Sequence, residues 1–208
     1  LHDAHCRFGM RIGADVICEK PLVLHARNLD QLEHVERETG RRVWNILQIR
    51  EHPAIKSRVG DFKTGVHNVK IEYYAPRGSW YAHSWKGDAK KSGGIGTNIG
   101  IHLFDAVTWL FGGVRTVELE AASESYLEGL VVLERADVRF RLSTDPGLSQ
   151  RRVFKIDGEQ IELTGAFASL HLAVYRGIVA GKGWGISDAR PAVELAERIR
   201  GYAKTMPK

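Results

Sequence analysis

The first 50 residues alternate between helical and extended hydrophobic spacing. Two helix-like and two strand-like stretches follow one another there: 4–12, 14–18, the run carrying Leu29, Leu32 and Val35, and 43–49. Gly13 and Gly40 each follow a helical stretch, where glycine readily takes the left-handed conformation that ends a helix. Helices alternating with short strands are typical of a parallel α/β sheet. We therefore predict that residues 1–52 form the closing elements of a doubly wound domain.

After His52-Pro53 the pattern becomes mainly extended. Strand spacing is predicted over residues 66–74, 114–121, 129–133, 138–142, 153–156 and 160–163, and helical spacing over 93–111, 170–179 and 192–203. Ser187 or Asp188 is expected to cap the last helix, with Pro191 in its first turn. The segments 134–137 and 157–159 are short enough for tight turns between antiparallel strands. For residues 53–208 we predict an α+β domain, an open antiparallel or mixed sheet with helices on one face.

Composition and charge exclude several classes of protein. Hydrophobic residues make up 43% of the 208 and charged residues 26%, which is enough apolar material for a core and excludes a disordered chain. The net charge is +5, but basic and acidic side chains are interleaved, so we expect no nucleic-acid partner. No apolar run approaches the roughly 20 residues of a membrane span. Two cysteines favour a reducing compartment, and we expect a cytoplasmic protein. Because His2, His5 and Cys6 lack a second cluster at zinc spacing, no metal site is predicted.

Lys20 is the first candidate for chemistry. It follows the apolar stretch 14–18 and precedes Pro21, which favours an extended backbone at the residue before it. The strand end directs Lys20 toward the crevice in which α/β sheets bind ligands. A lysine beside a low-dielectric crevice has a lowered pKa, and it can donate a hydrogen bond, orient a hydroxyl or take up a proton. The alternative is an ordinary solvated loop lysine.

A polar stripe on an apolar helix is the second candidate. Asn98, His102, Asp105 and Trp109 follow one another at steps of four, three and four, so they share one face of the predicted helix 93–111. A helix that is apolar almost all round is buried, and its polar side chains must be paired or face a ligand. Histidine is a natural general acid or base near neutral pH. The alternative is that His102 is a satisfied core histidine between two helices.

Two further segments carry candidate binding residues. Residues 77–86 combine aromatic rings with hydrogen-bond donors, which suits stacking on a base or sugar and holding a phosphate or carboxylate. A loop at a domain or subunit seam is the alternative. Gln48, Arg50 and His52 end a predicted strand, where they either contact a cofactor or form a structural turn.

Together these residues resemble the glucose–fructose oxidoreductase/inositol dehydrogenase (Gfo/Idh/MocA) family. The resemblance rests on Glu19-Lys20-Pro21 after a strand and on a later glycine-rich stretch that leads to the motif Asn98-Ile99-Gly100-Ile101-His102-Leu103-Phe104-Asp105. The chain departs from the family pattern by carrying Asn98 in place of Asp and by Ile95, which interrupts the glycine run. The asparagine form resembles the UDP-N-acetylglucosaminuronate 3-dehydrogenases of bacterial lipopolysaccharide O-antigen synthesis.

The resemblance implies oxidation of the C3 hydroxyl of a nucleotide sugar, with NAD as the hydride acceptor. It implies that Lys20 hydrogen-bonds the reacting hydroxyl beside the nicotinamide and that His102 is its acid/base partner. Which of the two takes the proton is left open. Expected substrate contacts are Thr97, Asn98, Arg77, Trp80, Tyr81 and Asp105; expected cofactor contacts are Glu19, Lys20, Gln48, Arg50 and His52. A relative acting on a free polyol or disaccharide, and a non-catalytic sugar-binding or assembly module, are the competing hypotheses.

The family is also expected to contain a dinucleotide-binding Rossmann domain. The chain begins at Leu1 and contains no G-x-G-x-x-G motif, so we interpret it as a fragment with a truncated Rossmann domain. We expect this fragment alone to be inactive with NAD. The resemblance further implies that the open sheet face builds a homodimer or homotetramer.

Overall fold

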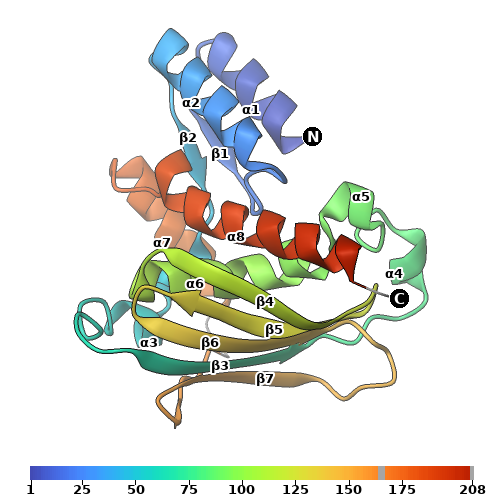
Figure 1. Ribbon diagram of the computed structural model, residues 1–208. Helices are drawn as coiled ribbons and strands as arrows, with labels where there is room; N and C mark the ends of the chain where they lie inside the picture. The colour runs from blue at the N-terminus through green and yellow to red at the C-terminus, as the bar shows by residue number, and fades with distance from the viewer. Residues whose placement is uncertain (164–166, 207–208) are drawn as a thin grey trace.

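The computed structural model describes residues 1–163 and 167–206 as an α+β fold with two sheets of unequal size. Figure 1 shows the smaller sheet and its two helices above a layer of helices, with the larger sheet below. The helices are α1 (His2–Arg11), α2 (Ala26–Thr39), α3 (Pro53–Lys56), α4 (Trp80–His83), α5 (Ala89–Ser92), α6 (Ile101–Phe111), α7 (Phe167–Val179) and α8 (Ile186–Thr205), with a 3₁₀ helix η1 (Gln48–Glu51) and a π-helical turn η2 (Gly96–Gly100). The strands are β1 (Val16–Cys18), β2 (Val43–Asn45), β3 (His67–Tyr74), β4 (Val114–Ala122), β5 (Tyr126–Leu133), β6 (Ala136–Ser143), β7 (Arg151–Ile156) and β8 (Glu159–Gln160).

The N-terminal part confirms the predicted order of helix, strand, helix and strand. β1 and β2 pair in parallel, with Val16 opposite Val43. The apolar positions of α2 that carried the helical spacing, Leu29, Leu32 and Val35, are buried. The second strand ends at Asn45, earlier than the predicted residue 49, because the amide of Leu47 bonds back to the carbonyl of Asn45 and the chain then turns into η1. That turn brings Gln48 to the carboxyl end of the two parallel strands.

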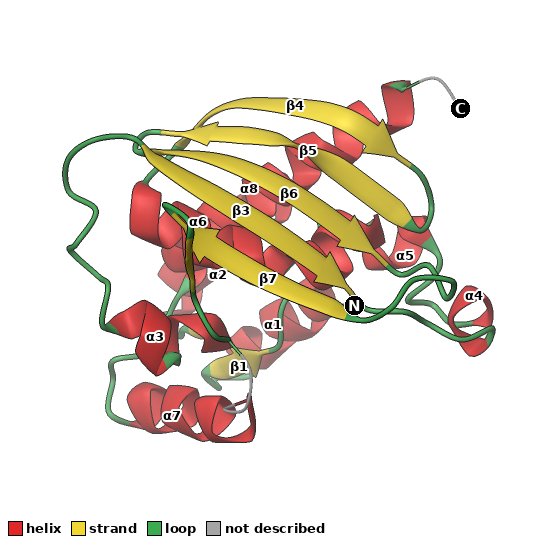
Figure 2. Cartoon of the chain, turned by 90° about the horizontal axis from the view of Figure 1, so that it is seen from below, coloured by secondary structure: helices red, strands yellow, loops and turns green. Residues whose placement is uncertain are grey.

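The larger sheet has six strands in the order β4-β5-β6-β3-β7-β8. β3 and β6 run parallel and every other neighbouring pair is antiparallel, so the sheet is mixed. Inward-facing residues of the central strands, such as Ile71, Val138 and Phe140, are buried against the helices. In Figure 2 the sheet lies in front of α6 and α8, so helices cover one face and the other is open. The predicted fold class and both tight turns are confirmed.

Two helices differ from their predicted bounds for local reasons. The helix predicted over 93–111 becomes regular only at Ile101. Gly93 and Gly94 have positive φ angles of 80° and 76° that a helix does not accept, and Gly96–Gly100 forms the π-helical turn η2. The last helix begins at Ile186, before the predicted 192; the Asp188 carboxylate accepts the amide of Gly185 at 2.8 Å, and Pro191 lies inside the helix. β8 is also shorter than predicted, and Leu163 lies beyond it.

Candidate active site

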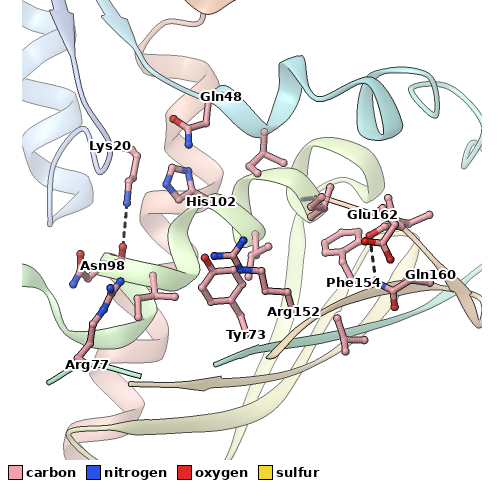
Figure 3. Close-up of a pocket in the computed structure, with 16 residues that line it drawn as sticks. Lys20, Gln48, Tyr73, Arg77, Asn98, His102, Arg152, Phe154, Gln160 and Glu162 are labelled. Carbon is pink, nitrogen blue, oxygen red and sulfur yellow. Dashed lines mark hydrogen bonds between the residues drawn. The ribbon is translucent and has the colours of Figure 1, made fainter. Parts of the chain in front are cut away.

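A cavity of about 300 Å³ opens where the two parts of the chain meet. Figure 3 shows its walls, which come from the loop after β1, from η1, η2 and α6, from the ends of β3 and β7, and from residues 160–163. Its polar lining consists of Lys20, Gln48, Tyr73, Arg77, Asn98, His102, Arg152, Gln160 and Glu162. Residues distant in sequence therefore share one space, and the two predicted catalytic side chains are both among them.

Lys20 reaches into this cavity from the loop that follows β1. Its ammonium donates a hydrogen bond to the backbone carbonyl of Asn98, with 3.1 Å between Nζ and the oxygen. Burial lowers the pKa of Lys20; the charge of Glu19 opposes this shift, and the nearby charges of Lys86 and Arg77 add to it. The structure thus places Lys20 in a half-buried site rather than in the solvated loop of the alternative hypothesis.

His102 lies in the first turn of α6 and points into the same cavity (Figure 3). Burial lowers the pKa of its imidazole well below the usual value, and the positive charge of Lys20 acts in the same direction. The ring is therefore neutral at pH 7 and able to accept a proton. Because it lines a cavity, His102 is not enclosed in dry packing between two helices.

Asn98 lies in the turn η2, one helical turn before His102. Its side-chain amide donates to the Tyr81 hydroxyl at 2.9 Å. This bond connects the aromatic segment 77–86 to the cavity wall, to which Arg77 also contributes. Trp80 is 54% exposed and does not line the cavity. Thr97 is buried and lies 3.5 Å from the guanidinium of Arg200, so its hydroxyl is turned away from the cavity.

Asp105 and Arg50 form a buried ion pair away from the cavity. The Arg50 guanidinium donates to both carboxylate oxygens of Asp105, the shortest contact being 2.7 Å, and each side chain is 3% exposed. Trp109 and Trp184 lie against the same guanidinium, 5.2 and 4.7 Å from ring centre to Cζ. Asp105 does lie on the helix face that the sequence pattern predicted. However, Asp105 and Arg50 were both expected to contact a ligand, and instead they pair with each other inside the protein.

The remaining predicted cofactor residues are divided among the cavity, the surface and the interior. Gln48 lines the cavity. Glu19 lies outside it and faces His171, with 3.3 Å between carboxylate and imidazole. His52 is buried as the cap of α3, where its Nδ1 accepts the amide of Ala54 at 3.3 Å, and burial lowers its pKa.

Several cavity residues were not predicted from the sequence. Tyr73 lies near the end of β3, Arg152 and Phe154 lie on β7, and Gln160 and Glu162 follow the second tight turn. Buried residues alternate with exposed ones along much of β3, and this alternation directs Tyr73 inward. The matching alternation of apolar residues was the one signal in the sequence that could have identified Tyr73. Arg152 faces it across the β3–β7 pairing, a contact between distant segments that no local motif encodes.

Neither a metal centre nor a membrane span is found in the described part of the chain. Among residues 1–163 and 167–206, no three His, Cys, Asp or Glu side chains are grouped so as to hold a metal ion. In the same residues, no helix has the length and apolar composition needed to cross a bilayer.

Comparison with known proteins identifies the family of this fold. The model of the oxidoreductase family C-terminal alpha/beta domain (Gfo/Idh/MocA) matches residues 63–185, which is more than half of the chain. The chain belongs to the Gfo/Idh/MocA oxidoreductase family. The match spans the larger sheet, Asn98 and His102, so the resemblance based on the sequence motifs is confirmed.

Among solved structures, the chain is similar to dehydrogenases that were solved in complex with NAD or NADH. The WlbA (WbpB) dehydrogenase of Thermus thermophilus is 39% identical in its complex with NAD and α-ketoglutarate, where the TM-score is 0.92 and the match covers all of this chain and 70% of that one. Its complex with NAD and UDP-GlcNAcA gives 40% identity, a TM-score of 0.91 and 69% coverage of that chain. The WlbA dehydrogenase of Bordetella pertussis has 16% identity and a TM-score of 0.83, over all of this chain and 76% of that one, and shows the shared fold.

A curated relative matches over a shorter region. YteT of Bacillus subtilis (strain 168), provisionally named an oxidoreductase, is 28% identical over 117 residues, which cover 53% of this chain. The matched segment is 27% of YteT, so the alignment spans about a quarter of that protein.

Proposed function

We propose that the protein containing this chain is an NAD-dependent dehydrogenase that oxidises the C3 hydroxyl of UDP-N-acetylglucosaminuronate or a closely similar nucleotide sugar. The observation that carries the proposal is the meeting of Lys20, Asn98 and His102 at one cavity. The similarity to dehydrogenases solved with NAD and UDP-GlcNAcA supports the choice of substrate. A role in bacterial lipopolysaccharide O-antigen synthesis is part of the same proposal.

The residues at the carboxyl end of β1 and β2 fit the reactive end of a nicotinamide cofactor. Ligands of open α/β sheets bind outside the carboxyl ends of the strands. Lys20 and Gln48 follow β1 and β2 there and both line the cavity, so these two residues would hold the nicotinamide end. When bound, NAD supplies the acceptor for the hydride that leaves the sugar carbon.

Lys20 and His102 divide the work on the sugar hydroxyl. As an ammonium, Lys20 donates a hydrogen bond that holds the oxygen and stabilises negative charge as it develops there. His102 takes up the hydroxyl proton, because its lowered pKa leaves the ring unprotonated at neutral pH. Oxidation thus balances: the hydride leaves carbon for the cofactor and the proton leaves oxygen for the imidazole.

Asn98 suits a substrate that carries its own carboxylate. The family pattern has an aspartate at this position, and a second carboxylate there would repel a uronate. The neutral Asn98 side chain avoids this repulsion, and its bond to the Tyr81 hydroxyl holds Tyr81 at the cavity edge. Arg77 is then available to contact the anionic sugar.

A direct test is to incubate the full-length protein that contains this chain with NAD and UDP-GlcNAcA and to follow the absorbance of NADH. We expect NADH formation with the uronate and little with myo-inositol or glucose. Activity with those free polyols and sugars but not with the nucleotide sugar would favour the first competing hypothesis. Tight sugar binding without NADH formation would favour a non-catalytic sugar-binding module.

A further inference from the structure

The cavity wall carries an excess of positive charge. Of its described lining residues, Lys20, Arg77 and Arg152 are cationic and Glu162 is the single acid, while His102 is neutral at pH 7. Three positive charges against one negative charge leave a net charge of +2 around this concave space. Such a charge distribution concentrates anions, since the field is focused by the low-dielectric walls.

Arg77 has a buried donor with no protein acceptor. Its backbone is fixed by a hydrogen bond from its amide to the carbonyl of Thr144 at 3.1 Å. The side-chain Nε is buried, and no residue of the described chain accepts its hydrogen. Leaving a buried donor without a partner is costly, and native structures usually supply that partner. The position of Arg77 on the cavity wall indicates that a ligand provides it (Figure 3).

Arg152 is an exposed residue of β7, and the sheet sets its position at the cavity wall. It lies directly opposite Tyr73 in the β3–β7 pairing, and its guanidinium carbon is 5.7 Å from the centre of the Tyr73 ring. The neighbouring Arg151 points to the opposite face of the sheet, where it pairs with Glu72. Because successive side chains of a strand point to opposite faces, Arg152 lies on the cavity side of β7. Stacking on the Tyr73 ring preorganises its planar guanidinium.

From these observations we propose that Arg77 and Arg152 form an anion subsite that selects substrates bearing a carboxylate or phosphate group. The inference rests on the proposed function, because it assigns the charged part of that same substrate to these two side chains. Arginine matches both anions with two parallel hydrogen bonds. Neutral polyols offer no such partner, so the subsite determines specificity and Lys20 and His102 remain at the reacting hydroxyl.

The test compares R77Q and R152Q with the wild type in the full-length protein. Dissociation constants are measured by calorimetry with saturating NADH, which cannot oxidise the sugar, for three ligands: UDP-GlcNAcA, UDP-GlcNAc, and free N-acetylglucosaminuronate. R37Q is the matched control, because Arg37 is an exposed residue of α2 and does not line the cavity. R77K and R152K keep the charge but lose the two-pronged geometry.

We expect the dissociation constant for UDP-GlcNAcA to rise about 10- to 100-fold in each glutamine variant, the range for hydrogen bonds to charged groups. R37Q should match the wild type, and the lysine variants should fall between. If the subsite holds the carboxylate, the loss appears with both uronates and is absent with UDP-GlcNAc. If it holds a phosphate, the loss appears with both UDP-linked ligands and is absent with the free uronate.

Two results would overturn the inference: glutamine variants that bind all three ligands as the wild type does, or a wild type that binds none of them. The NADH assay on the same preparations separates this result from the proposed function. A wild type that binds UDP-GlcNAcA through these arginines but forms no NADH contradicts the function and supports the subsite. A wild type that forms NADH, with variants of unchanged affinity, contradicts the subsite alone.

Discussion

The Lys20 ammonium donates a hydrogen bond to the backbone carbonyl of Asn98, 78 residues further along the chain. The contact joins the loop after β1 to the turn η2, which leads directly into the helix that carries His102. Because the acceptor belongs to the backbone, it does not depend on the side chain at position 98. The bond therefore fixes where the ammonium lies relative to α6, whichever residue contacts the sugar.

Removing either proposed catalytic side chain should abolish most of the turnover. In the full-length protein we expect Lys20→Ala and His102→Ala each to lower kcat with UDP-GlcNAcA and NAD by at least about 100-fold, the usual contribution of a general acid–base group. Steady-state NADH formation measures the effect, and circular dichroism confirms that each variant is folded. Near-normal rates in both folded variants would end the catalytic assignment.

The acidic side of the pH profile should report on His102. Its pKa is lowered well below 6.5, so the neutral, proton-accepting ring persists as the pH falls through 6.5. We expect kcat/KM to stay level through that pH and to decrease only in more acidic solution. The lowered pKa of Lys20 predicts an alkaline decrease that begins below the usual value of 10.5. If His102→Ala kept the same acidic decrease, another group would be the proton acceptor.

The ion pair between Arg50 and Asp105 should matter for stability. Asp105→Ala leaves a buried guanidinium without its main counter-charge, and breaking such a pair costs about 3–5 kcal/mol. Glu38→Ala is the matched control; its pair with Arg11 is exposed, and an exposed pair contributes about 0–1 kcal/mol. The free energy of unfolding from urea titration measures both. Equal losses of unfolding free energy in the two variants would show that burial does not increase the contribution of the Arg50–Asp105 pair to stability.

We propose that the open face of the larger sheet mediates a homodimer or homotetramer. Leu130 lies on that face, in a shallow hollow among Glu128, Arg139 and Arg141. In the full-length protein, Leu130→Glu should lower the molar mass of the assembly in solution toward that of a monomer, because a buried charge without a partner disfavours association. Light scattering after size-exclusion chromatography measures the mass, with the exposed Val59→Glu as the control. An unchanged mass would exclude this face as the interface.

Local patterns predicted that Lys20 and His102 would meet at one cavity, but they predicted less of what surrounds these two residues. Lys20 and His102 were found because each lies on an element whose periodicity is evident from neighbouring residues. The same periodicity placed Asp105 on the His102 face, but helical spacing does not show whether a polar side chain meets a ligand or a buried partner. Asp105 is paired with Arg50, a residue from a distant element. Arg152 was missed for the same reason, since strand pairing with Tyr73 brings it to the cavity.

The most direct test of the account is the position of the sugar C3 hydroxyl in a crystal structure of the full-length protein with NAD and UDP-GlcNAcA. We predict that the C3 oxygen lies within about 3.2 Å of both Lys20 Nζ and a ring nitrogen of His102, the reach required for proton transfer. A sugar bound with its C3 oxygen beyond hydrogen-bond distance of both groups would contradict the account.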